Sequence, residues 1–215
     1  MKRLIGGFLL VLMSGVAIAG SWSITGTIGS AIPADAHSGA QGEIAATGAA
    51  CGCAVSGSAD VRQLFAGVGL AYRVNRWVSV SGGGWAARSF QENVVLSGSS
   101  GSAPASIRDR LSGGYVLAEA HHRFARRWAW AAGVGLAVTS DSESGSITVN
   151  GSTTTFPADA TTRVSPAFSA AVSYLFNRRW SAGLSYLEIP NVGSSGNQYT
   201  AGAVGLAAAT ASYRF

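Results

Sequence analysis

The chain contains little charge, and beyond residue 20 it has no run of about 18 consecutive apolar residues. Charged residues make up 12% of the sequence, although 47% of the residues are hydrophobic. A membrane-spanning helix needs roughly 20 apolar residues, so this absence excludes such a helix after residue 20. A chain of this kind can cross a membrane only as a closed β-barrel, because a barrel pairs every backbone N–H and C=O group between its strands.

Cysteine is nearly absent, and neither of the two cysteines lies near the N-terminus. The N-terminal residues have the features of an export signal, which are Lys2 and Arg3, an apolar stretch over 4–18, and Ala17-Ile18-Ala19 before Gly20. We predict a signal peptide over 1–19 and one domain over 20–215. The absence of a cysteine at the cleavage site argues against a lipid-anchored lipoprotein.

One pattern occurs four times: an alternating strand, a short arginine-bearing link, and a new strand that opens on tryptophan. Three copies lie at 72–77, 122–128 and 174–180, and the fourth ends the chain at 213–215. The spacing predicts eight strands, at 21–29, 62–74, 77–90, 109–124, 128–139, 163–176, 180–189 and 199–215. Short turns at one rim and long loops at the other are typical of an all-β, eight-stranded antiparallel transmembrane β-barrel, with its short turns in the periplasm and its long loops outside the cell.

Alternate residues of the predicted strands fall into a large apolar set and a small or polar set. In 128–139, Trp128, Val134 and Leu136 share one face, and small residues occupy the other. In the last strand, Tyr213 and Phe215 share the apolar face, opposite Arg214. Large residues outside and small residues inside suit the narrow interior of eight strands. The strand at 77–90 leaves the orientation of Trp77 and Trp85 open.

Eight aromatic residues are expected at one level, near the short turns. They are Tyr72, Phe124, Trp128, Trp130, Tyr174, Trp180, Tyr213 and Phe215. A soluble β-sandwich would explain the alternation but not this common level, whereas an aromatic girdle at a membrane interface explains both. The arginines beside the girdle are expected to reach lipid headgroups. A nucleic-acid partner is not expected, because the arginines and aromatics do not form one interleaved patch.

The last third of the chain resembles the transmembrane domain of the OmpA family. The matching residues are Val164-Ser165-Pro166-Ala167-Phe168, Val172, Tyr174, Leu184, Tyr186, Asn191, Gly193 and Ser212-Tyr213-Arg214-Phe215. Eight-stranded relatives of the OmpX and Ail type share the plan and the terminal Tyr-x-Phe. The resemblance implies a monomer in the outer membrane of a Gram-negative bacterium, in contact with lipid and lipopolysaccharide. It also implies that Tyr213 and Phe215 form the signal read by the barrel-assembly machinery.

Few polar side chains are expected inside the barrel, and the candidates are Glu119, His121, Arg73 and Arg123. An unpaired carboxylate in the interior is costly, so we expect Glu119 to lie near Arg73, Arg123 or His121. Glu119 and His121 with a neighbouring serine would suggest a lipid hydrolase, but their inward parity turns them away from the bilayer. We therefore expect no enzyme, no cofactor and no metal site.

The four long connections, at 30–61, 91–108, 140–162 and 190–198, are rich in Gly, Ser, Ala and Thr. This composition predicts mobile, solvated loops, which carry function if any is specific. The first loop contains Cys51-Gly52-Cys53, and an oxidising compartment allows a strained, labile disulfide between the two cysteines or, as the less favoured alternative, a disulfide to another molecule.

The predicted function is structural: a barrel that contributes to envelope integrity and presents its loops at the surface. One alternative is an adhesin of the Ail and OmpX type that binds host factors or phage. The other is a narrow, porin-like pore for small solutes.

Overall fold

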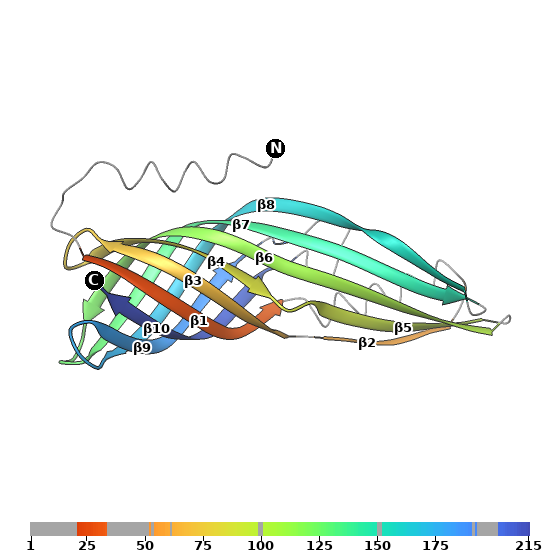
Figure 1. Cartoon of the computed structure of the whole chain (residues 1–215), viewed down its shortest axis with the longest axis horizontal. Coiled ribbons are helices and arrows are strands. Elements are labelled where there is room, and N and C mark those ends of the chain that lie inside the picture. Colours follow the sequence, from red (N-terminus) through yellow and green to blue (C-terminus); the bar gives the residue numbers. More distant parts are fainter. Residues whose placement is uncertain are drawn as a thin grey trace.

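A computed structural model of the chain describes residues 21–33, 52, 54–60, 62–98, 101–149, 152–190, 192 and 202–215. The predicted signal peptide, Cys51 and Cys53 lie outside these residues. Within them, ten antiparallel strands form one sheet (Figure 1). The strands are β1 (Ser21–Pro33), β2 (Ala54–Ala59), β3 (Gln63–Arg73), β4 (Val78–Ala87), β5 (Phe90–Gly98), β6 (Gly101–Arg123), β7 (Trp128–Val149), β8 (Ser152–Leu175), β9 (Trp180–Ile189) and β10 (Val204–Arg214).

Eight of these strands close into a ring. Strand β1 pairs with both β3 and β10, and the remaining neighbours follow in the order β4, β6, β7, β8 and β9. The predicted eight-stranded antiparallel barrel is confirmed. In the described part of the chain, no helix has the length and apolar character that a membrane crossing requires.

The short turns lie at residues 74–77, 124–127 and 176–179, and we call this end the short-turn rim. Two of the turns are built alike around an asparagine. The Oδ1 atom of Asn75 accepts hydrogen bonds from the backbone N–H groups of Trp77 and Val78, at 2.7 and 2.9 Å. Asn177 does the same for Arg179 and Trp180, both at 2.8 Å. Asparagine side chains stabilise turns in this way, so the repeated motif has a common local cause.

At the other end, β2, β5 and the outer parts of β6, β7 and β8 extend beyond the ring as one long sheet (Figure 1). We call this the outer sheet. Strand β5 pairs with β6 from Phe90–Asp109 to Gly98–Gly101, and β7 pairs with β8 as far as Val149–Ser152. The prediction of mobile loops at 91–108 and 140–162 is therefore wrong. Both segments are rich in glycine and serine, but they also contain β-branched residues such as Val94 and Ile147. These residues favour the strand conformation when a neighbouring strand pairs with them.

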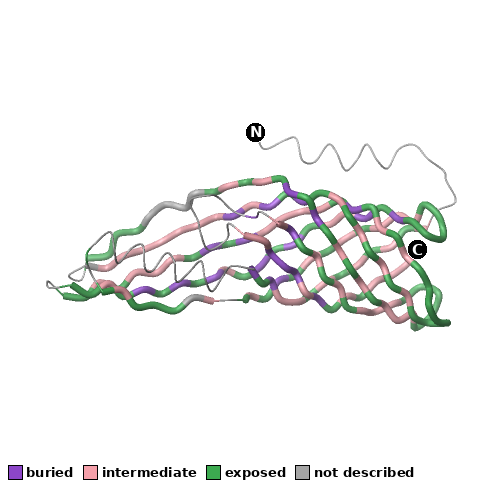
Figure 2. The backbone as a smooth tube through the Cα atoms, turned by 180° about the vertical axis from the view of Figure 1, so that it is seen from behind, coloured by how far each residue is buried: buried purple, intermediate pink, exposed green. Residues whose placement is uncertain are grey.

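Buried positions gather where the ring meets the outer sheet (Figure 2), and their apolar side chains form a layer that fills the ring there. We call it the apolar layer. Its larger members, each at most 6% exposed, are Phe65, Trp85, Phe90, Leu111, Leu117, Ile189, Val192, Val204 and Leu206. All of them except Val192 lie in strands, where they occupy inward-facing alternate positions, as parity requires. Trp85 therefore points inward. Of the two side chains whose orientation the sequence left open, Trp77 and Trp85, this settles the second.

Pro166 lies within β8, although proline cannot donate a hydrogen bond to a strand neighbour. The ladder between β8 and β9 begins only at Phe168, paired with Glu188, so Pro166 lies beyond it and has its registered partner, Leu136, on β7. A proline at an unpaired edge costs little.

Candidate functional site

The outer surface of the ring is apolar over most of its height. Its large hydrophobic side chains are exposed to a degree that is unusual for a protein in water: Leu184 is 70% exposed, Val164 67% and Ile28 63%. Other exposed members include Ile24, Leu64, Val68, Leu70, Val116, Val134, Leu136, Val138, Phe168 and Val172. Continuous apolar surface of this extent marks contact with a membrane or a partner, and a closed ring of it matches lipid on all sides.

The eight predicted girdle residues all lie at the short-turn rim, and many of their rings touch. Trp128 lies 5.2 Å from Tyr174, Trp180 lies 4.9 Å from Tyr213, and Tyr213 lies 5.3 Å from Phe215, measured between ring centroids. The structure adds four rings to the predicted set: Trp22, Trp77, His122 and Phe176. Trp77 belongs to the turn before β4, is 46% exposed and stacks on His122 at 5.2 Å, so strand parity could not place it.

Arginines of the turns lie against these rings. Arg76 lies over Trp77 at 5.2 Å, and Arg127 donates a hydrogen bond of 2.9 Å to the Tyr174 hydroxyl. That hydrogen bond raises the pKa of Arg127, so its guanidinium stays charged. Cations beside interfacial aromatics can reach phosphate groups while their stems remain on apolar surface.

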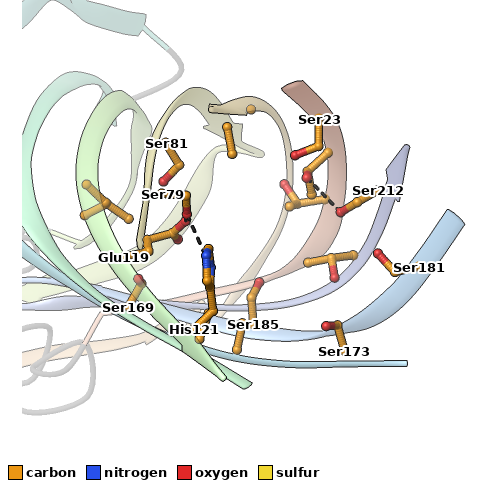
Figure 3. A pocket seen from close by; sticks show the side chains of 18 of the residues that line it. Ser23, Ser79, Ser81, Glu119, His121, Ser169, Ser173, Ser181, Ser185 and Ser212 are labelled. Atoms are coloured by element: carbon orange, nitrogen blue, oxygen red, sulfur yellow. Dashed lines mark hydrogen bonds between the residues drawn. The ribbon is translucent and has the colours of Figure 1, made fainter. Parts of the chain in front are cut away.

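Inside the ring, a cavity of about 260 Å³ runs from the apolar layer toward the short-turn rim. Hydroxyl groups dominate its polar lining, and the serines labelled in Figure 3 come from β1, β4, β8, β9 and β10. Thr25 and Ser212, for example, share a hydrogen bond of 2.7 Å. This half of the interior is therefore polar but mostly uncharged, in contrast to the apolar layer beyond it.

Glu119 and His121 both line this cavity, and Ser79 on the neighbouring β4 lies between them (Figure 3). The Ser79 hydroxyl donates to Oε2 of Glu119 at 3.3 Å and lies 3.5 Å from Nδ1 of His121. His121, one of the three expected neighbours of Glu119, is linked to it through the Ser79 hydroxyl, whereas among the described residues no ion pair joins Glu119 to Arg73 or Arg123. The register explains this, because β4 separates Arg73 on β3 from Glu119 on β6.

The order of these three groups differs from that of a hydrolase. In a catalytic triad the histidine lies between the serine and the acid, so that one ring nitrogen accepts the serine proton and the other is held by the carboxylate. Here Ser79 lies in the middle, and its contact with His121 is at the upper limit for a hydrogen bond. In the described ranges, no three His, Cys, Asp or Glu side chains are grouped so as to hold a metal ion.

A second cavity, of about 540 Å³, lies at the short-turn rim and shares Arg73, His121 and Arg214 with the first. Arg123 lines it from the end of β6. The sequence predicts Arg73 and Arg123 for the interior; Arg214 is not among these candidates, although parity places it on the inner face. We call Arg73, Arg123 and Arg214 the arginine cluster.

The fold is similar to solved outer-membrane proteins. Neisserial surface protein A is 11% identical, with 92% of this chain and all of that chain (100%) covered and a TM-score of 0.51. OprG of Pseudomonas aeruginosa is 13% identical over 92% of this chain and 96% of its own, with a TM-score of 0.48. Ail of Yersinia pestis, solved with the heparin analogue sucrose octasulfate, is 14% identical over 91% and 97%, with a TM-score of 0.45.

No protein-family model and no curated protein matches the chain. The closed ring, its apolar exterior and its aromatic girdle agree with the similarity to Neisserial surface protein A. The chain therefore has the fold of the eight-stranded outer-membrane β-barrels of Gram-negative bacteria, as the resemblance of its last third implied.

Proposed function

We propose that this protein is a structural, monomeric barrel of the outer membrane that contributes to envelope integrity and carries the outer sheet to the cell surface. The ring contacts phospholipid at the periplasmic level and lipopolysaccharide at the outer level. The observation that carries the proposal is the combination of an exterior that is apolar over most of its height with an interior closed by the apolar layer. Such a barrel acts through the contact of its outer surface with the membrane and not through a passage in its interior.

The same layer argues against the narrow pore. Phe65, Trp85 and Leu117 lie on the inner face and are each at most 6% exposed, so they occupy the interior through which a solute would pass. An eight-stranded ring leaves room for little more than its own side chains. Catalysis is also not proposed, because the order of Glu119, Ser79 and His121 does not match that of a triad.

Surface binding is the second candidate, and the order of the outer sheet favours it. Arg108 and Arg110 are both exposed on one face of β6 in this sheet. Arginine is among the residues that contribute most to binding hot spots, and a rigid strand presents it at little entropic cost. The partner would be an anionic host or phage surface.

A trimmed barrel can separate the two candidates. Glu92 and Ile107 are opposite each other, as are Glu143 and Asp159, so 93–106 and 144–158 can each be replaced by an Asn-Gly turn. We expect a deletion strain to become more sensitive to bile salts and the trimmed barrel to restore resistance fully. Failure of even the full-length protein to change resistance would overturn the structural role. Loss of adhesion to host matrix by the trimmed barrel alone would identify the outer sheet as a binding surface.

We also propose that the C-terminal strand is the signal for the barrel-assembly machinery. The Phe215 ring is 71% exposed, and its backbone N–H donates to the carbonyl oxygen of Trp22 at 2.9 Å, so it contributes to closing the ring. Deleting Phe215 is expected to lower the amount of folded protein in the outer membrane by roughly tenfold or more, with processing of the signal peptide unchanged.

Fractionation and the electrophoretic mobility of unboiled samples measure this. Phe176 is a suitable control, since it is also an exposed aromatic at the short-turn rim but lies in a turn. Phe176→Ala should assemble normally. Unchanged surface levels after deletion of Phe215 would count against the role assigned to it.

A further inference from the structure

The arginine cluster has no part in the proposed structural role. Arg73, Arg123 and Arg214 end the strands β3, β6 and β10. In the register, Arg73 is opposite Ser21 and Arg214 is opposite Ser23, so the two arginines lie on either side of β1. Ring closure thus brings to the periplasmic mouth three guanidinium groups that are far apart in the sequence.

The charges at this mouth are not balanced by its own lining. The residues around the 540 Å³ cavity include four arginines and two histidines, and neither aspartate nor glutamate is among them. Glu119 lines the inner cavity, but its carboxylate is directed to Ser79. Like charges gathered in a partly enclosed space repel one another, and an anion that enters between them relieves that repulsion.

The periplasmic mouth is a pocket and not the entrance of a channel, because the interior is closed at its outer end. The apolar layer closes the outer end, so a ligand that enters from the periplasm must leave by the same route. Hydroxyl groups of Ser21, Ser173 and Ser181 line the cavities beside the arginines and can donate further hydrogen bonds to oxygen atoms of a ligand.

We propose that the periplasmic mouth binds a phosphate-type oxyanion, held by Arg73, Arg123 and Arg214. Guanidinium groups recognise phosphoryl oxygens by paired, charge-assisted hydrogen bonds, and arginine is preferred over lysine where this geometry is needed. The phosphoryl group belongs either to a soluble periplasmic solute or to the headgroup of a lipid in the periplasmic leaflet.

The test uses the folded barrel in a zwitterionic detergent, titrated with sodium pyrophosphate at constant ionic strength. Trp77 and Trp130 line the cavity, so their fluorescence reports occupancy, and calorimetry confirms it. We expect saturable binding. Arg73→Gln with Arg214→Gln should weaken it by roughly tenfold or more, because hydrogen bonds to charged groups carry about that much affinity.

Arg126→Gln is the matched control, since Arg126 is an exposed arginine of a periplasmic turn that does not line either cavity. It should bind pyrophosphate as the wild type does. If the double variant does not fold, as judged by its mobility without boiling, Arg123→Gln takes its place. Equal affinity in the cluster variants and the control, or no saturable binding, would overturn the proposal.

Two lipid environments then distinguish the sources of the phosphoryl group. In nanodiscs of phosphatidylcholine alone, pyrophosphate should bind as in detergent. If phosphatidylglycerol in the nanodisc weakens pyrophosphate binding by competition, the natural ligand is a lipid headgroup. Unchanged binding there supports a soluble ligand. Either result supports the oxyanion site, and both are independent of the bile-salt phenotype that tests the structural role.

Discussion

Leu184→Arg is expected to destabilise the barrel by about 2–4 kcal/mol in a lipid bilayer, the cost of placing an arginine near the midplane of a lipid-facing strand. Leu184 is 70% exposed and lies four residues from Trp180, which belongs to the girdle. It is paired with Val172 and Ala209, so only apolar neighbours surround a charge placed there. Urea unfolding of the barrel in vesicles, followed by tryptophan fluorescence, measures the difference.

Two further variants show whether the effect comes from lipid. Thr155→Arg places the same side chain on an exposed position of the outer sheet, where water solvates it, and stability should not change by more than about 0.5 kcal/mol. Leu184→Ala removes the apolar side chain without adding charge and should cost less than Leu184→Arg. Equal stability of Leu184→Arg and Thr155→Arg would mean that this face of the ring does not lie in the bilayer.

Gly135→Val is expected to prevent folding or to destabilise the barrel by roughly 3 kcal/mol or more, because it overpacks a site with no space. Gly135 lies on the inner face of β7, where an added Cβ would overlap the carbonyl oxygen of Val116 and lie 2.8 Å from the Cα of Leu117. These are backbone atoms of the paired strand β6 and cannot move without breaking the ladder. The fraction that regains folded mobility after refolding into detergent measures the effect.

Gly26 provides the comparison. It lies on the outward face of β1, and an added Cβ would meet no atom within 4 Å. Gly26→Val should therefore refold with the same yield as the wild type. If both valine variants refold equally well, the close approach of β6 and β7 at Gly135 is not a constraint on the barrel.

The membrane-spanning parts of the strands could be predicted from the sequence, since alternation and the repeated turn motif both act locally. The range 180–189 coincides with β9, and 62–74 differs from β3 by one residue at each end. In both strands most lipid-facing residues are large, and the inner residues are small through the middle of the strand, as at Gly67 and Gly69 in β3 and at Ser181 and Gly183 in β9. The parity that placed Arg214 and Glu119 on the inner face follows from the same alternation.

The outer sheet and the interior contacts could not be predicted in this way. Residues 91–108 and 140–162 form strands because a neighbouring strand pairs with them, and composition alone does not reveal that partner. Ser79 was missed as the partner of Glu119 because the contact depends on the register between β4 and β6, which residue spacing within one strand does not fix. Trp77 belongs to a turn, to which alternation does not apply.

The apolar layer separates the protein into two parts that differ in how freely they can accept amino-acid substitutions. In the proposed orientation, side chains of the outer sheet contact the surroundings of the cell, while the hydroxyl-lined cavity remains on the periplasmic side of Phe65 and Trp85. The surface half can therefore accumulate substitutions without opening a leak for ions. Substitutions in the outer sheet that are selected by antibodies or phage would therefore not change the permeability of the outer membrane.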